Sequence, residues 1–198
     1  METLKTITYK GEEIEIWYVS DYDFTDWINE NEAFIVYNHR DFTVKRKGFD
    51  PKDIFEAYRE GKKLYDGHWI MPLYAYIHSG VSLSLSRAYD PWDTSFKGFV
   101  LVKRIKGWSY TREKAFSIAK SVVEEWNHCL GGEIYGYSTI SDSCGGFIGP
   151  EGLEQAIEEA KHSIDAHIAK KRKQHFNQLK IWIKNRVPYY VRKELQFI

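Results

Sequence analysis

The sequence lacks any apolar run long enough to cross a membrane. Its longest apolar stretches fall well short of the ~18 to 20 residues that a bilayer-spanning helix needs. The chain begins with Met1-Glu-Thr-Leu-Lys5, which lacks the apolar core region of a secretory signal peptide. We therefore expect a cytoplasmic protein with no membrane partner.

Cysteine is also scarce, with only Cys129 and Cys144 among 198 residues. Two thiols are too few for a disulfide framework or a zinc ribbon, so we expect both to be reduced. His162, His167 and His175 are spaced by five and eight residues, whereas a helical metal site uses a four-residue step. The sequence therefore predicts neither a metal nor another cofactor.

Three common enzyme signatures are missing as well. The chain has no Walker lysine loop, no Gly-x-Gly-x-x-Gly and no Gly-x-Ser-x-Gly, which excludes ordinary nucleotide hydrolases, dinucleotide enzymes and α/β-hydrolases. Aromatic residues, in contrast, make up 16% of the chain. Aromatic rings are favoured where a flat ligand or a partner must be held, so this excess points to a binding surface.

The net charge of zero conceals a strong asymmetry along the chain. Residues 1–32 contain nine acids and two lysines, whereas residues 161–198 contain ten Lys or Arg and two acids. Such polarity can attract nucleic acid, an anionic ligand or the acidic end of a second copy, and it does not distinguish among them. A basic helix face that simply contacts solvent is the alternative.

Hydrophobic periodicity predicts mixed helices and strands. Ile14 and Ile16 alternate with Glu13 and Glu15, which favours a hairpin of strands over 4–9 and 13–19. Further strands are expected at 34–37, 71–78, 81–86, 98–103, 133–140 and 146–148, and helices at 21–31, from Asp50 to Gly61, from Thr111 to Gly131 and from Pro150 onward. The expected fold class is α+β, a mainly antiparallel sheet packed by helices, with a long C-terminal helix.

The second predicted hairpin has a register that bears on catalysis. If residues 79–80 form a two-residue turn, His78 pairs with Val81 and shares the face of Leu83. Ser84 then points to the opposite face. On this interpretation His78 and Ser84 cannot act as a catalytic dyad.

The last helix is expected to be unusually long. Its apolar residues recur at steps of three and four until Pro188, beyond the typical ~8 to 20 residues of a globular helix. It either breaks near residues 170–173 or extends past the domain to meet a partner helix, and we favour the second. We therefore expect an α+β domain over 1–150 and a helical extension over 151–198. The extension would pack on that domain or on a second subunit in a homo-oligomer.

Three segments combine aromatic rings with glycine and small polar residues: 74–80, 91–99 and 142–149. Small residues expose backbone N–H groups and rings offer a stacking surface, a combination that suits an anionic ligand with a planar base. Ordinary turn chemistry is the alternative. The candidate ligand-binding residues are Tyr74, Tyr76, His78, Ser79, Arg87, Trp92, Asp93, Thr94, Lys97, Ser143 and Cys144.

These candidates divide by their chemistry. Trp92 and Tyr76 could stack on the base, and His78, with the Ser79 and Thr94 hydroxyls, could hold phosphate or ribose. Asp93 could accept a hydrogen bond from the base or the sugar. Arg87 or Lys97 could neutralise the ligand's charge.

The same segments resemble a family of small, mostly uncharacterised proteins encoded by phages and other mobile elements. Members show Tyr-x-Tyr-x-His-Ser-Gly, then Pro-Trp-Asp and Gly-Phe, then Asp-Ser-Cys followed by an aromatic residue, Gly and Phe. The likeness spans residues 74–149. This chain departs from it at Tyr89-Asp90, where Ser-Cys is expected, and at Gly145, where an aromatic residue is expected, so a two-cysteine site is not expected. The resemblance implies a phage accessory protein that counters host defence.

Three functions remain open on these grounds. We favour a protein that binds and sequesters a nucleotide-type immune signal, without turnover, in the cytoplasm of the infected cell. A second possibility is an inhibitor that contacts a host defence nuclease or its nucleic acid through the charged ends of the chain. The third is an enzyme that degrades a nucleotide signal, with Cys144 as nucleophile, His78 as base and Asp93 or Asp142 as orienting group.

Overall fold

The computed structural model describes residues 2–19, 32–38, 43–78, 80–87 and 93–194. Antiparallel sheets pack against helices and a long helix lies near the C-terminus, so the predicted α+β class is confirmed. The helix expected at 21–31 falls outside the described residues. No described helix is both long and apolar enough to span a membrane.

The chain divides into two compact units, and each is assembled from separate stretches of sequence. Unit 1 comprises Met1–Tyr18, Tyr135–Phe147 and Glu151–Ile198, and unit 2 comprises Val19–Ile134 and Ile148–Pro150. This partition differs from a boundary at residue 150. The difference arises because the N-terminal hairpin packs with the C-terminal helix and not with the strands that follow it in sequence.

Unit 1 contains a four-stranded sheet in the order β1-β2-β9-β10. Its strands are β1 (Glu2–Tyr9), β2 (Glu12–Tyr18), β9 (Ile134–Ser138) and β10 (Ser143–Ile148). Ile14 and Ile16 on β2 are fully buried, whereas Glu13 and Glu15 are exposed. The predicted N-terminal hairpin and its alternation are therefore confirmed.

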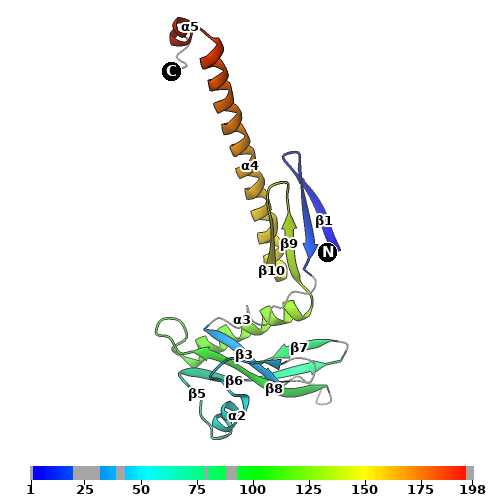
Figure 1. Ribbon diagram of the computed structural model, residues 1–198. Helices are drawn as coiled ribbons and strands as arrows, with labels where there is room; N and C mark the ends of the chain where they lie inside the picture. Colours follow the sequence, from blue (N-terminus) through cyan, green and yellow to red (C-terminus); the bar gives the residue numbers. More distant parts are fainter. Residues whose placement is uncertain (1, 20–31, 39–42, 79, 88–92, 195–198) are drawn as a thin grey trace. The chain divides into compact units, whose positions relative to one another are not determined.

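Helix α4 (Gly149–Arg186) runs without a break for 38 residues, so it continues through the basic run at 170–173. Its first half buries Ala156, Ala160 and Ile164 against the isoleucines of β2. From residue 169 onward almost every side chain is exposed, and Figure 1 shows this second half extending past the strands of its own sheet. A short helix, α5 (Tyr189–Glu194), follows.

The turn between β1 and β2 is tied to α4 by one carboxylate. Lys10 Nζ donates a 2.6 Å hydrogen bond to Asp165, and the Tyr9 hydroxyl donates a longer one of 3.3 Å. The bond from Lys10 lowers the pKa of Asp165, and the same bond raises the pKa of Lys10. Both side chains are about half exposed to solvent, so the contribution to stability is small.

We predict that Asp165→Asn lowers the unfolding free energy of the protein near neutral pH. The pKa of Asp165 is lower in the folded than in the unfolded protein. The extra unfolding free energy of the wild type over the variant is therefore fully present above the unfolded pKa and is lost as pH falls through the folded pKa. Urea unfolding from pH 7 down to pH 3 measures this, with Glu154→Gln on the same helix as control. An advantage that stays constant down to pH 3 would contradict the assignment.

Unit 2 contains a six-stranded antiparallel sheet with a helix on each face (Figure 1). Its strand order is β4-β3-β8-β6-β5, and β7 pairs with β6. The strands are β3 (Ala33–Asn38), β4 (Thr43–Val44), β5 (Leu64–Tyr65), β6 (His68–Ile77), β7 (Val81–Ser84) and β8 (Thr94–Lys103). The helices are α2 (Pro51–Arg59) and α3 (Arg112–Leu130).

Both helices begin where the sequence predicts them. Asp50 precedes Pro51, and its side chain accepts a hydrogen bond from the Lys52 backbone N–H. The Thr111 side chain accepts one from the Lys114 backbone N–H. These contacts satisfy backbone donors that have no partner within the first turn of a helix. Gly131 ends α3, as predicted.

The two faces of this sheet carry different apolar clusters. On one face, α3 buries Trp126 against Ile35 and Val100. On the opposite face, the much shorter α2 buries Ile54 against Phe34 and neighbouring apolar residues of β3, β6 and β8. Because side chains alternate along each strand, both faces are apolar at the centre of the sheet.

Gly98 on β8 permits the close pairing of β8 with β3. A Cβ at this position would collide with the backbone carbonyl oxygen of Val36. We predict that Gly98→Ala lowers the unfolding free energy by about 2 to 4 kcal/mol, because the backbone would have to shift. Thermal unfolding measures the effect, with Gly80→Ala as control, since the space around Gly80 is open. Equal stability of the two variants would contradict the close approach.

Candidate functional site

The hairpin of β6 and β7 has a register that differs by one residue from the predicted one. Ile77 pairs with Val81 and Tyr76 pairs with Ser82, so the connection spans three residues, 78–80. The prediction that His78 pairs with Val81 is therefore wrong. His78 belongs to the loop, where its backbone N–H donates to the Gly80 carbonyl at 3.2 Å.

This register decides which side chains accompany the tyrosines of β6. Tyr74 pairs with Ser84 and Tyr76 with Ser82, whereas Ala75 pairs with Leu83. Leu83 lies in the cluster beneath α3. The two tyrosines and the two serines consequently lie on the other face of the sheet, the face on which α2 packs.

A β-bulge in β8 brings a phenylalanine to the same face. Gly98 pairs with Leu73 and Phe96 with Tyr74, so Lys97 is the extra residue between them. Unbroken alternation from Phe99 would have placed Lys97 beside the tyrosines. The bulge shifts the alternation by one residue and places Phe96 there instead.

The rings on this face form a connected group. The centroid of Phe96 lies 6.0 Å from that of Tyr74, 5.7 Å from that of Phe55 on α2 and 5.1 Å from that of the buried Phe99. Tyr76 lies two residues beyond Tyr74 on the same face. We name Phe55, Tyr74, Tyr76 and Phe96 the aromatic platform.

The platform is open to solvent because α2 is too short to cover it. Nine helical residues span about 13 Å, whereas the ten residues of β6 span about 33 Å. Phe55, Tyr76 and Phe96 are 40%, 36% and 37% exposed, and Tyr74 is half-buried. A contiguous group of exposed rings is unusual on a protein surface and commonly marks a binding site.

Polar groups border the platform. The centroid of the His78 ring lies 6.5 Å from that of Tyr76, and the two rings meet edge to face at 82°. The Asp93 carbonyl accepts a hydrogen bond from the Ile77 N–H, which fixes the start of β8 against the end of β6. Thr94, opposite Tyr76, is buried, and within the described residues its hydroxyl has no hydrogen-bond partner.

Cationic side chains are also present near these strands. Lys97 is half-buried in the bulge and Arg87 is exposed beyond β7. In the described part of the chain neither forms an ion pair. The Arg59 guanidinium lies 6.0 Å from the centroid of Phe55. An anionic group held at the platform would therefore find positive charge that no carboxylate already neutralises.

The structure brings two of the three predicted segments together. In the described parts of segments 74–80 and 91–99, residues 74–76 on β6 pair with residues 94–96 on β8. Ser143 and Cys144, from the third segment, belong to unit 1, whereas the platform belongs to unit 2. Two further predicted residues, Ser79 and Trp92, lie outside the described residues.

Hydrogen bonds of the third segment make a turn. Asp142 accepts from the Tyr137 hydroxyl at 2.9 Å and from the Ser143 N–H at 2.9 Å. Thr139 N–H donates to the Asp142 carbonyl. Burial and the bond to Asp142 both raise the pKa of Tyr137. The Asp142 carboxylate is thus engaged in holding the β9–β10 connection.

The two cysteines differ in their surroundings. Cys144 is exposed on β10, and among the described residues its thiol donates a hydrogen bond to the adjacent Gly145 carbonyl. Cys129 is buried in the core beneath α3, and burial raises its pKa to about 12. Cys129 therefore stays protonated and inaccessible at neutral pH.

We predict that iodoacetamide modifies Cys144 and spares Cys129 in the folded protein. Mass spectrometry of peptides after a short reaction at pH 8 measures this, and the urea-unfolded protein provides the control in which both thiols react. Comparable modification of both cysteines in the folded protein would contradict the burial of Cys129.

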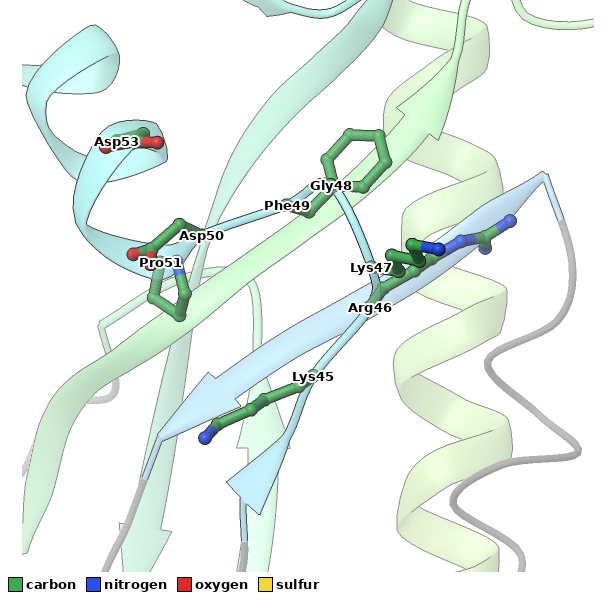
Figure 2. Close-up of a pocket in the computed structure, with 8 residues that line it drawn as sticks. All are labelled: Lys45, Arg46, Lys47, Gly48, Phe49, Asp50, Pro51 and Asp53. Carbon is green, nitrogen blue, oxygen red and sulfur yellow. The ribbon is translucent and has the colours of Figure 1, made fainter.

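A separate open hollow of about 460 Å³ lies between β4 and α2 (Figure 2). It is lined by Lys45, Arg46, Lys47, Gly48, Phe49, Asp50, Pro51 and Asp53. Asp50 caps the start of α2 and Asp53 lies in its first turn. The N-terminus of a helix attracts anions, and here these two carboxylates already occupy it. None of the predicted binding residues lines this hollow. The described residues also contain no cluster of His, Cys, Asp and Glu that could hold a metal ion.

Sequence reasoning missed Phe55 and Phe96 as site residues. Phe96 lies within the second predicted segment, but regular strand alternation gives no sign that a bulge redirects it. Phe55 and Tyr58 are three residues apart on α2 and lie beside its buried stripe of Ile54 and Ala57. Exposed rings at that spacing on an otherwise charged helix were the available signal.

No protein-family model, no curated protein and no solved structure matches this chain. The resemblance to phage-encoded proteins therefore stays a prediction. The function must be inferred from the residues of the platform and their surroundings.

Proposed function

We propose that the aromatic platform binds the planar base of a nucleotide-type ligand. The observation that carries this proposal is a connected group of three rings, Phe55 on α2 with Phe96 and Tyr74 on the sheet, beside which Tyr76 lies exposed on the same face. Aromatic side chains stack on nucleobases, and each stacked base contributes about 1 to 3 kcal/mol. Three of these four rings are more than a third exposed, so a base could reach them without rearrangement of the core.

The groups around the platform suit the remainder of such a ligand. Arg59, whose guanidinium lies 6.0 Å from the centroid of Phe55, and Arg87 would neutralise phosphate. The Ser82 and Ser84 hydroxyls, on the tyrosine face of β7, and the His78 imidazole would hydrogen-bond phosphate or ribose. This assignment keeps Tyr74, Tyr76 and His78 of the first predicted segment and assigns no role to Ser143 or Cys144.

In this proposal the protein captures its ligand without converting it. The platform contains rings and hydroxyl groups, and Cys144, the predicted nucleophile, belongs to the other unit. In the phage setting that the resemblance implies, the ligand would be a nucleotide immune signal in the cytoplasm of the infected cell. The experiment below distinguishes capture from degradation of the signal, and a protein that only inhibits a defence protein by direct contact would bind no compound in it.

The experiment uses a panel of cyclic dinucleotides, ADP-ribose and mononucleotides. Thermal unfolding with each compound identifies binders, and isothermal titration calorimetry gives their affinities. The bound compound is then released by heating and analysed by mass spectrometry. Recovery of the intact compound supports capture, whereas an altered compound indicates catalysis. No thermal shift with any member of the panel would contradict the proposal.

We predict that Tyr76→Ala and Phe96→Ala each weaken binding of the panel compound about 5- to 150-fold, because each removes a stacking surface. The control is Phe116→Ala on α3, which removes a ring that is 50% exposed on the other side of the same sheet. The control should bind as the wild type does. Equal losses in all three variants would show that the platform is not the binding site.

A further inference from the structure

Helix α4 has two halves of opposite charge. Its first half, residues 149–168, contains Glu151, Glu154, Glu158, Glu159 and Asp165 but only one base, Lys161. Its second half, residues 169–186, contains no acid. The seven bases of the second half are Lys170, Lys171, Arg172, Lys173, Lys180, Lys184 and Arg186. We name residues 169–186 the basic arm.

The positive charge of the basic arm is not balanced within the described chain. Every arm residue is exposed except Ile183, which is half-buried. No arm side chain takes part in an ion pair among the described residues. The acids of the first half are partly paired in contrast, since Asp165 contacts Lys10 and Glu158 contacts Lys161. The arm is therefore a rod of uncompensated positive charge.

Five of the arm's seven bases form two rows with an apolar line between them. Successive residues of a helix are rotated by about 100°, which places Phe176 and Ile183 on one line along the arm. On one side of this line are Lys173, Lys180 and Lys184, and on the other are Arg172 and Arg186. The Lys180 ammonium lies 4.8 Å from the centroid of the Phe176 ring, as expected for residues one helical turn apart.

We propose that the basic arm binds double-stranded DNA by lying in the major groove. A helix with its side chains is about 10 to 12 Å across, and the major groove of B-form DNA is about 12 Å wide. The apolar line would face the base edges, where thymine methyl groups offer apolar contact. The two rows of bases would contact the phosphates on either side. The 18 residues of the arm span about 27 Å, the length of about eight base pairs.

Other occupants fit this arrangement less well. A second arm would place seven further positive charges against the first, which is unfavourable. A lipid surface calls for one broad apolar face, whereas Ile181 and Trp182 point about 140° and 120° away from Phe176. The major groove of A-form RNA is too narrow for side chains to enter. Duplex DNA is the polyanion that accommodates both rows of bases and the line between them.

This proposal is independent of the nucleotide-type ligand. The basic arm belongs to unit 1 and the aromatic platform to unit 2. A variant that loses DNA binding should therefore keep its affinity for the panel compound, and Tyr76→Ala should keep its affinity for DNA.

The test measures fluorescence anisotropy of a labelled 20-base-pair DNA duplex with the full-length protein from 50 to 200 mM salt. Each phosphate contact contributes about 0.9 to the slope of log affinity against log salt, so seven bases set a limit of about 6. The K170A/K171A/R172A/K173A variant removes two bases of the rows, Arg172 and Lys173, so we expect the slope to fall by about 1.8. Between 50 and 200 mM salt the affinity of the wild type should then fall about 12-fold more than that of the variant.

A charge-matched control separates the arm from net charge. K45A/K47A/K106A/K114A removes four exposed bases of unit 2 and should bind DNA as the wild type does. A second arm variant, K180Q/K184Q, changes one row only and should lose part of the slope. Circular dichroism confirms that each variant keeps its helix, and alanine and glutamine both favour helix.

Three outcomes would overturn the proposal. The first is an affinity for the duplex that does not change with salt. The second is an equal loss of affinity in the arm variants and in the charge-matched control. The third is equal or tighter binding to double-stranded RNA, single-stranded DNA of the same length or anionic lipid vesicles. Preference for the duplex, with a slope that falls only in the arm variants, supports the proposal.

Discussion

The antiparallel pairing of β6 with β8, interrupted by one bulge, determines the surface on which the proposed function depends. Gly98 allows β8 to approach its neighbour β3 closely, and the extra residue Lys97 then reverses the alternation of the strand. Without the bulge, Lys97 and Ser95 would lie on the same face as Phe99. With the bulge, Phe96 lies on that face instead. A single inserted residue thus turns a lysine and serine surface into a ring surface.

Unequal coverage of the sheet explains why those rings remain exposed. Helix α3 has 19 residues and covers the core of one face, whereas α2 has nine and covers only the centre of the other. One apolar cluster, which includes Ile35 and Val100, stabilises one face of the sheet. A second cluster, which includes Phe34 and Leu101, stabilises the other face. The rings past the end of α2 add little to that core. Their exposure is a cost in water that a bound ligand would relieve.

Local patterns in the sequence predicted most of the fold, because they rest on interactions between near neighbours. The caps at Asp50 and Thr111 and the alternation around Ile14 each involve residues a few positions apart. The predicted register of the β6–β7 hairpin was wrong because one additional residue in the loop shifts every pair of residues along the two strands. Nothing in the local sequence distinguishes a two-residue from a three-residue connection at 78–80. The grouping of the N-terminal hairpin with α4 depends on contacts more than 140 residues apart in sequence, such as the hydrogen bond from Lys10 to Asp165.

The candidate site was only partly predictable for the same reason. Tyr74, Tyr76 and His78 were found because ring and small residues recur within one short segment. Phe96 was hidden by the bulge, and Phe55 reaches the platform from a helix that no local pattern links to β6. The third segment shares its composition with the other two, yet its hydrogen bonds form a turn in the other unit. Composition alone therefore does not separate a segment of the platform from a turn.

The most direct test of the platform is an NMR titration of the protein, labelled with ¹³C in its aromatic rings, with the panel compound that gives the largest thermal shift. The account predicts ring-current shifts at Tyr74, Tyr76, Phe96 and Phe55 that saturate together. The rings of Phe116 on α3 and Trp182 on the basic arm should not change. Shifts at those two rings, with the platform rings unaffected, would contradict the account.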